Sequence, residues 1–351
     1  MLDLPCIEVA GTPAAMGEAI GEALRAPIHA LSDRRTEAIR IYVAERGLPE
    51  PDLAGLGGAC LDVLRGWHLA GWEEHVATAR SAGLDPAVFY ALVQMTDVRD
   101  LASLPAQADA EGCTAVLVPS EATAAGSPLA GQTWDLNAAD VDCVVAVKRT
   151  PDDGPSTWSV TVAGAPTLMG MNEHGLAVGT TNIKVAGART GVGYMSLLHR
   201  AVQCNDRREA AATIMQAPRI AAHTYWCVDD MGVLELECDA MQCTQREGHS
   251  TALSRTNHCL HAARTDAEPA AENSIKRLAT ATAALDRSDN SIDTIRALFA
   301  DRSEGICSIN RRHDDGEPTA TNACVIADPS ARVLHACRGE ADRGQWLTLG
   351  W

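Results

Sequence analysis

The Gly112-Cys113 pair lies within "ADAEGCTAVLVP" (108–119), where a charged, loop-like stretch meets an apolar, β-branched run. If the backbone at Gly112 is strained, the Cys113 sulfur can attack the Gly112 carbonyl, and water can then cleave the resulting thioester. Glycine leaves this carbonyl open and tolerates unusual dihedral angles. Cleavage would make Cys113 a new N-terminus, whose α-amine has a reference pKa of roughly 7.7–8.0. That amine can serve as the base for its own thiol, replacing the histidine of a Cys-His pair.

A buried structural cysteine is the alternative interpretation of Cys113. The chain has twelve cysteines, scattered singly and without CxxC or zinc-finger spacing. In a reducing compartment we expect most of them to be free, buried and small apolar core residues. The Gly-Cys pair alone therefore does not decide between a nucleophile and a core residue.

Other kinds of chemistry have no motif in this chain. The sequence contains no P-loop, no GxGxxG after a strand, no HExxH and no GxSxG. Its eleven histidines are dispersed, so we expect neither a metal nor a cofactor. The formal net charge of −17 argues against nucleic acid or an anionic membrane as a partner. The first residues lack a secretory signal and no stretch is long and apolar enough to span a membrane, so we expect a cytoplasmic location.

Helices should dominate the first hundred residues, and strands should follow Cys113. The apolar spacing predicts helices over 14–31, 35–46, 59–83 and 85–101, with Asp85 as N-cap and Pro86 in the first turn. Short β-branched runs predict strands over 114–119, 127–136, 143–149, 156–163 and 175–183.

The later part of the chain mixes both kinds of element. The stretch 195–217 resembles one long helix, and 271–300 is a second helical block. "DDMG" (229–232) is typical of a hairpin turn, and two further strands are predicted on either side of "ADPSA". Because no regular βαβ alternation occurs, we reject a doubly wound parallel sheet and expect antiparallel sheets covered by helices, in one domain over 1–351.

Four motifs occur in an order that is specific when they are taken together. They are "EGCTAV", "GQTWDLN", "MGMNEHGLAVGTTN" and "SRTNHCL". With the opening "GTPAAMGEAIGEAL", they resemble the autoproteolytic acyltransferases and amidohydrolases related to isopenicillin-N (acyl-coenzyme A:6-aminopenicillanate) acyltransferase. This is the peptidase C45-like, cysteine branch of the N-terminal nucleophile (Ntn) hydrolases. The resemblance spans nearly the whole chain and implies an α+β fold, a four-layer αββα sandwich with an N-terminal helical segment.

The resemblance also implies residue roles. Cys113 matches the nucleophile, and Gly112-Cys113 matches the self-cleavage bond. Asp135 in "GQTWDLN" matches an acid that supports processing or positioning of the nucleophile. Asn257 in "SRTNHCL" matches the side-chain donor of the oxyanion hole. Cleavage would give an α-chain (1–112) and a β-chain (113–351) that remain associated, and further assembly of such units into a homo-oligomer stays open.

One segment departs from the pattern of the relatives. Some relatives carry an arginine directly after the cysteine of an "SIC" motif, whereas "GICSINRR" has Ser308 in that place. Arg311 or Arg312 could compensate, and we assign the role to neither. This departure argues against assuming a penicillin-like acid as the substrate.

Five further residues are candidates for substrate binding. Trp134 either forms a wall of the pocket or belongs to the core. His223 and Tyr225 are polar residues on the strand "AAHTYW", and Thr114 adjoins the nucleophile. His258 is the candidate base for a Cys-His pair, which an amine-based mechanism does not need.

Three readings of function follow. The first is an amidohydrolase that cleaves a small-molecule amide through a thioester, with acyl transfer to an amine as its variant. The second keeps an uncleaved chain with Cys113 as nucleophile and His258 as base. The third is a non-catalytic binding relative of the same fold.

Overall fold

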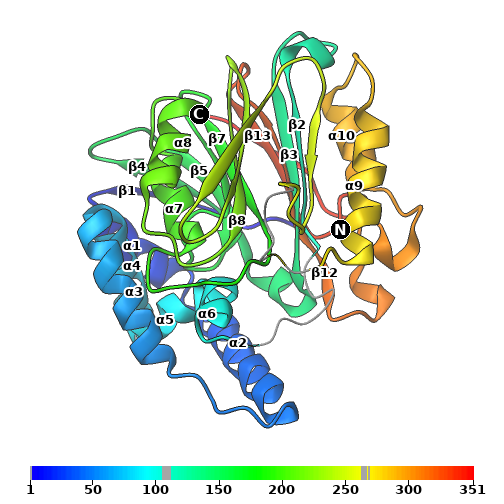
Figure 1. The fold of residues 1–351 in the computed structure, drawn as a ribbon. Helices are drawn as coiled ribbons and strands as arrows, with labels where there is room; N and C mark the ends of the chain where they lie inside the picture. Colours follow the sequence, from blue (N-terminus) through cyan, green and yellow to red (C-terminus); the bar gives the residue numbers. More distant parts are fainter. Residues whose placement is uncertain (1, 105–111, 262–266, 268) are drawn as a thin grey trace.

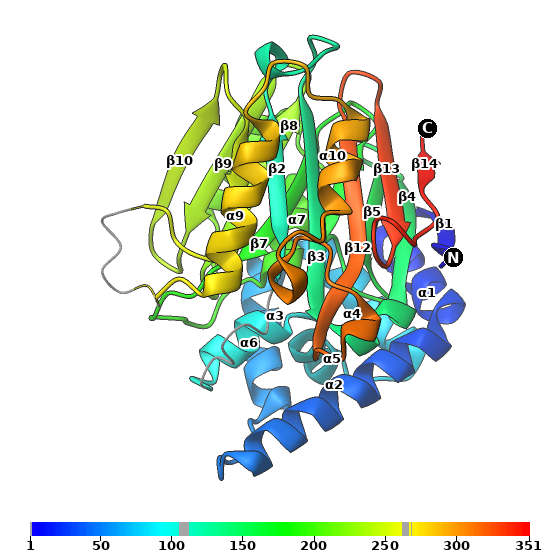
Figure 2. The same cartoon turned by 90° about the vertical axis from the view of Figure 1, so that its right-hand side faces the viewer.

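Two β-sheets stack face to face in the computed structural model, which describes residues 2–104, 112–261, 267 and 269–351. Helices cover both outer faces of the stack (Figures 1 and 2). The arrangement is the expected α+β, four-layer αββα sandwich with an N-terminal helical segment. In the described ranges, no helix has both the length and the apolar character required to cross a membrane.

The eight-stranded sheet is antiparallel apart from one edge pair, in which β1 runs parallel to β4. Its spatial order is β1 (Cys6–Gly11), β4 (Val144–Pro151), β5 (Thr157–Val162), β6 (Met169–Asn172), β7 (Ala177–Asn182), β8 (His223–Asp229), β9 (Gly232–Cys238) and β10 (Cys243–Gly248). The hairpin predicted around 229–232 is confirmed by the pairing of β8 with β9. The predominance of helices in the first hundred residues is confirmed, but strand β1 was not predicted, and it joins this sheet beside a strand that follows much later in the chain.

The six-stranded sheet is antiparallel throughout. Its order is β11 (Leu253–Arg255), β2 (Thr114–Val118), β3 (Leu129–Asn137), β12 (Thr319–Asp328), β13 (Val333–Arg338) and β14 (Leu347–Leu349). Strand β2 is buried on both faces because successive side chains point in opposite directions. Ala115 and Leu117 belong to the main core, while Val116 and Val118 belong to a second core that includes residues of α9 and α10.

Six helices follow β1 in the described part of the N-terminal segment, residues 2–104. They are α1 (Pro13–Ala23), α2 (Arg25–Glu45), α3 (Leu53–Trp67), α4 (Leu69–Ala82), α5 (Pro86–Val93) and α6 (Met95–Leu101). The predicted cap is confirmed, since the Asp85 side chain accepts hydrogen bonds from the Ala87 and Val88 N–H groups. A Cβ atom on Gly17 would lie 2.3 Å from the Glu74 carbonyl oxygen, so glycine permits the close contact between α1 and α4.

The outer helices of the sandwich are α7 (Tyr194–Ala201), α8 (Arg207–Gln216), α9 (Glu272–Leu285) and α10 (Ile292–Phe299). Short 3-10 turns occur at Ser120–Ala122, Ala138–Cys143, Gly305–Cys307 and His313–Asp315. The single helix predicted over 195–217 is wrong. The Asp206 side chain accepts hydrogen bonds from the N–H groups of Arg208 and Glu209 and so begins a second helix.

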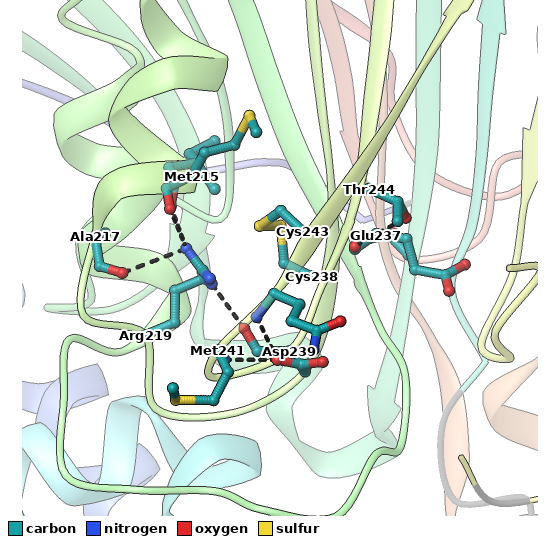
Figure 3. Close-up of a disulfide and its surroundings, with 12 residues drawn as sticks. Met215, Ala217, Arg219, Glu237, Cys238, Asp239, Met241, Cys243 and Thr244 are labelled. Atoms are coloured by element: carbon teal, nitrogen blue, oxygen red, sulfur yellow. Dashed lines mark hydrogen bonds between the residues drawn. A yellow bond between two sulfur atoms is a disulfide. The ribbon is translucent and has the colours of Figure 1, made fainter. Parts of the chain in front are cut away.

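Cys238 and Cys243 form a disulfide between β9 and β10 (Figure 3). The two residues lie directly opposite each other in the strand register, with their Cα atoms 4.1 Å apart. None of the other ten cysteines, all of which are described, forms a disulfide, and seven of them are buried, which confirms the expectation for most of them. Their isolated positions in the sequence gave no sign of this cross-strand register.

Candidate active site

Gly112 and Cys113 lie at the start of β2, beside the end of β3. The Gly112 N–H donates to the Asp135 carbonyl oxygen at 3.4 Å, and the Cys113 Sγ lies 3.8 Å from the same oxygen. Cys113 is buried, with 6% of its surface exposed. The antiparallel pairing of Thr114 with Thr133 sets this register. The β2–β3 pairing therefore brings the predicted acid beside the predicted cleavage bond.

The space around Gly112 is filled by charged side chains. A Cβ atom at this position would lie 2.6 Å from Arg311 Nη1 and 2.8 Å from Asp135 Oδ2. Both distances are shorter than real Cβ contacts, so no larger residue fits without displacing the acid or the guanidinium. The structure thus supplies a steric reason for glycine here, in addition to the conformational reason that the sequence suggested.

Burial raises the pKa of Asp135 to about 6, and the positive charges of Arg277 and Arg311 act against that rise. The Asp135 side chain is fully buried. A carboxyl group with a pKa near 6 can exchange a proton close to neutral pH, which is a property of groups that act in proton transfer.

Arg311 is the arginine beside the cleavage bond. Its backbone N–H donates to Thr321 Oγ1 at 3.0 Å, and its Nη1 has no hydrogen-bond partner among the described residues. Arg312 instead pairs with Asp342. Ser308 is buried, and its hydroxyl accepts a hydrogen bond from the Glu304 N–H. Of these two arginines, Arg311 is therefore the one that lies beside Gly112.

Arg277 joins the nucleophile strand to the loop that carries Asn257. Its Nη1 donates to the Cys113 carbonyl oxygen at 2.5 Å and to Thr114 Oγ1 at 3.1 Å. Its Nη2 donates to Asn257 Oδ1 at 3.0 Å. Burial lowers the pKa of Arg277 to about 10, which leaves the guanidinium charged at neutral pH.

The sequence reasoning missed Arg277, although the helix carries a signal for it. Ser274, Arg277, Ala281 and Leu285 are spaced three and four residues apart, and all four are buried. An arginine within the apolar stripe of a helix needs buried polar partners. The sequence pattern could therefore have predicted that Arg277 is buried and hydrogen-bonded, but not which residues are its partners.

Hydrogen bonds to both the oxygen and the nitrogen of its side-chain amide orient Asn257. Oδ1 accepts from Arg277, while Nδ2 donates to the Asn182 carbonyl oxygen at 3.0 Å. Because the amide nitrogen carries two hydrogens, one remains for a further acceptor. The loop is fixed by Glu237, whose Oε2 accepts from Arg255 Nη1 and from the Leu260 N–H, each at 2.8 Å.

A small pocket lies beside the thiol. Its lining consists of Thr96, Cys113, Trp134, Asp135, Leu136, Leu168, Thr180, Asn182, Tyr194 and His223. The structure therefore brings Trp134 and His223 together with Cys113 and Asp135. Asn257 does not line this pocket, but it is hydrogen-bonded to Asn182, which does.

His223 forms a buried pair with the carboxylate of Asp97. Its Nε2 lies 2.8 Å from Asp97 Oδ1, and its ring stacks on Tyr194 with centroids 4.4 Å apart. Nδ1 has no hydrogen-bond partner among the residues that the structure describes. In the tautomer that donates from Nε2 to Asp97, Nδ1 is an acceptor.

The remaining three candidates do not line the pocket. Tyr225 is fully buried near His223, with ring centroids 6.0 Å apart. The Thr114 hydroxyl accepts from Arg277, and its N–H donates to Thr133 Oγ1. The His258 ring contacts Ser274 Oγ at 2.7 Å, and burial lowers the pKa of His258. The structure does not bring His258 into the pocket with Cys113.

Within the described ranges, no group of three or more histidine, cysteine, aspartate or glutamate side chains could hold a metal ion. The assembled site consists of a thiol, a buried acid, two buried arginines and an oriented amide. Such a set can supply a nucleophile, a proton acceptor and a donor for a developing oxyanion.

Comparison with known proteins adds a family match. A family model described as acyl-coenzyme A:6-aminopenicillanic acid acyl-transferase matches residues 123–343. The match begins after Cys113 and includes Asp135, Asn257, Arg277 and Arg311. A search of curated proteins found no match.

Solved structures with a similar chain path include an acid amidase, an acylase and a bile acid hydrolase. A Caenorhabditis elegans N-acylethanolamine-hydrolyzing acid amidase ortholog has 10% identity and a TM-score of 0.47, covering 62% of this chain and 93% of its own. Penicillin V acylase from Agrobacterium tumefaciens has 12% identity and a TM-score of 0.46, covering 68% and 86%. A conjugated bile acid hydrolase mutant from Clostridium perfringens has 9% identity and a TM-score of 0.43, covering 68% and 97%.

Proposed function

Because the chain belongs to the acyl-coenzyme A:6-aminopenicillanic acid acyl-transferase family, we propose that it is a self-cleaving cysteine amidohydrolase acting on a small-molecule amide. One observation carries the proposal. Asp135 and Arg311 enclose Gly112 so closely that a Cβ atom has no room, and Arg277 links the carbonyl of Cys113 to Asn257.

Self-cleavage begins with the Cys113 thiol. Its sulfur attacks the Gly112 carbonyl carbon, the C–N bond to Cys113 breaks, and the thiol proton passes to the new α-amine. Asp135 lies against Gly112, and its carboxylate can carry that proton between the two groups. Water then hydrolyses the thioester, which leaves a carboxylate on Gly112 and a free thiol and amine on Cys113.

The mature site uses the same residues for an external amide. The thiol of Cys113 attacks the substrate carbonyl, and the remaining Nδ2 hydrogen of Asn257 donates to the oxyanion. The α-amine of Cys113 takes the thiol proton and gives it to the departing amine. Water releases the acid from the thioester and restores the thiol. His223, positioned by Asp97, offers Nδ1 as an acceptor to the amine part of the substrate.

Acyl transfer is the second candidate, and the description of the family favours it. In that reaction an amine replaces water in the last step, with the same thioester on Cys113. Both reactions share every residue named above. They differ in whether water or an amine reaches the thioester faster.

The experiment is an amide-cleavage assay on the mature protein and on Asn257→Ala, each first checked by mass for cleavage. We expect Cys113-dependent release of amine, and a decrease in kcat of about 10²–10³ for Asn257→Ala, the typical cost of one oxyanion donor. Cys259→Ala is the matched control, because this half-buried cysteine lies in the same loop. With hydroxylamine added, the ratio of hydroxamate to free acid measures how well an amine competes with water for the thioester. A mature protein that cleaves no amide and transfers no acyl group contradicts the proposal.

A further inference from the structure

A larger cavity adjoins the small pocket at the thiol. Its volume is about 380 Å³, within the range of roughly 300–1,000 Å³ that is usual for small-molecule sites. Thr96 and Leu136 line both spaces, so the cavity lies next to the catalytic pocket. The larger cavity is lined by Ala38, Ile39, Ile41, Tyr42, Glu45, Arg46, Pro51, Leu53, Ala91, Met95, Thr96, Val98, Arg99, Ala102, Leu104, Leu136 and Asn137.

The walls come mainly from one face each of α2 and α6. Ala38, Tyr42 and Glu45 follow one another at helical spacing on α2, and Met95 and Val98 do so on α6. Ile41 is 50% exposed at this wall. Large apolar side chains exposed around a hollow are typical of sites that receive an apolar group.

Helix α6 separates the apolar cavity from the polar end of the catalytic pocket. Asp97 holds His223 through Oδ1 and accepts the Tyr194 N–H through Oδ2, each at 2.8 Å. Its neighbours Thr96 and Val98 line the cavity. A substrate amide at Cys113 therefore has polar groups on the side of His223 and a largely apolar space on the other side of Thr96.

The charged residues of the cavity wall are engaged by their neighbours. The Arg99 guanidinium forms an ion pair with Asp100 at 2.7 Å. Arg46 lies over the Tyr42 ring at 3.9 Å and within 3.5 Å of the Glu45 carboxylate. These pairings satisfy positive charge within the wall, so an uncharged apolar group suits the cavity better than an anionic one.

From this arrangement we infer that the cavity binds the acyl group of the substrate, and that this group is a hydrocarbon chain of medium or greater length. The inference rests on the proposed function. In this account the reacting groups come from Cys113 and the residues after it, while α2 and α6 in the N-terminal segment select the acyl group. The amine remains on the side of His223.

The first test compares amides of one amine that carry acetyl, hexanoyl or dodecanoyl groups. We expect kcat/KM to rise up to fourfold, approximately, for each methylene that enters the cavity. Ala38→Trp should reduce the dodecanoyl-to-acetyl ratio of kcat/KM at least tenfold, because an indole would occupy the cavity. Ala44→Trp is the matched control, since Ala44 is exposed on the same helix and does not line the cavity. Its ratio should equal that of the wild type.

A second test measures binding without turnover. The N-dodecanoyl and N-acetyl amides are titrated by calorimetry into Cys113→Ala, with and without Ala38→Trp. Tighter binding of the dodecanoyl amide that disappears with Ala38→Trp supports the inference even if turnover fails. Equal binding of both amides, or a preference that Ala38→Trp leaves unchanged, overturns it. If acetyl amides are cleaved and kcat/KM does not change with acyl-chain length, the assignment of the cavity to the acyl group is wrong, while the proposed function still holds.

Discussion

Gly112 is confined by side chains that come from distant parts of the sequence. Replacement by alanine would place Cβ 2.6 Å from Arg311 Nη1 and 2.8 Å from Asp135 Oδ2. The collision would move the Gly112 carbonyl or displace both charged groups. We therefore predict that Gly112→Ala slows self-cleavage at least tenfold, measured as the loss of full-length chain over time on a denaturing gel. Gly58→Ala, where the nearest atom to a new Cβ is 3.7 Å away, is the control and should process normally.

Asp135 should make the uncleaved protein less stable as the pH rises. Its pKa is about 6 in the folded chain and 3.8 as the ordinary value, so its contribution to stability is complete below pH 3.8 and is lost as pH increases through 6. The test compares Cys113→Ala with the double variant Cys113→Ala/Asp135→Asn, whose side chain at position 135 does not titrate. The unfolding free energy of Cys113→Ala minus that of the double variant should fall by about 2 kcal/mol from pH 4.5 to 7.5. Urea unfolding at several pH values measures it. A difference that does not vary with pH contradicts this account of Asp135.

At the scale of elements, the β2–β3 pairing could be predicted and the role of α9 could not. Local β-branched runs indicated both strands, and antiparallel pairing of neighbours places Asp135 beside Cys113. Arg277 and Arg311 lie much later in the sequence, and their contacts depend on which helix covers which sheet face. Spacing cannot supply that information. The same holds for β1, whose partner β4 follows more than a hundred residues later.

Helix α9 is expected to position the site through Arg277. Arg277→Lys keeps a charge but loses the planar fork that reaches Cys113, Thr114 and Asn257 together. We predict a decrease of about tenfold or more in both the self-cleavage rate and kcat, with little change in KM. Lys276→Arg on the same helix is the matched control, because Lys276 is partly exposed and pairs with Glu272. A normal cleavage rate and normal kcat in Arg277→Lys would show that α9 serves only packing.

At the scale of the whole molecule, cleavage should not separate the two products. Strand β1 of the N-terminal segment pairs with β4, and one apolar core includes residues from both sides of Cys113. Separation would expose this core to water at a cost of about 25 cal/mol per Å² of apolar surface. We predict that fragments 1–112 and 113–351 elute together from a sizing column without denaturant and separate in 6 M guanidinium. Elution as two species without denaturant would contradict the shared core.

The most direct test is the intact mass of the purified wild-type protein beside that of Cys113→Ala. The account predicts two wild-type masses that divide the chain between Gly112 and Cys113, and one full-length mass for the variant. Two fragments cut at another bond, or a wild-type chain that stays whole after long incubation, would contradict it. In the latter case Cys113 would act, if at all, within an intact chain.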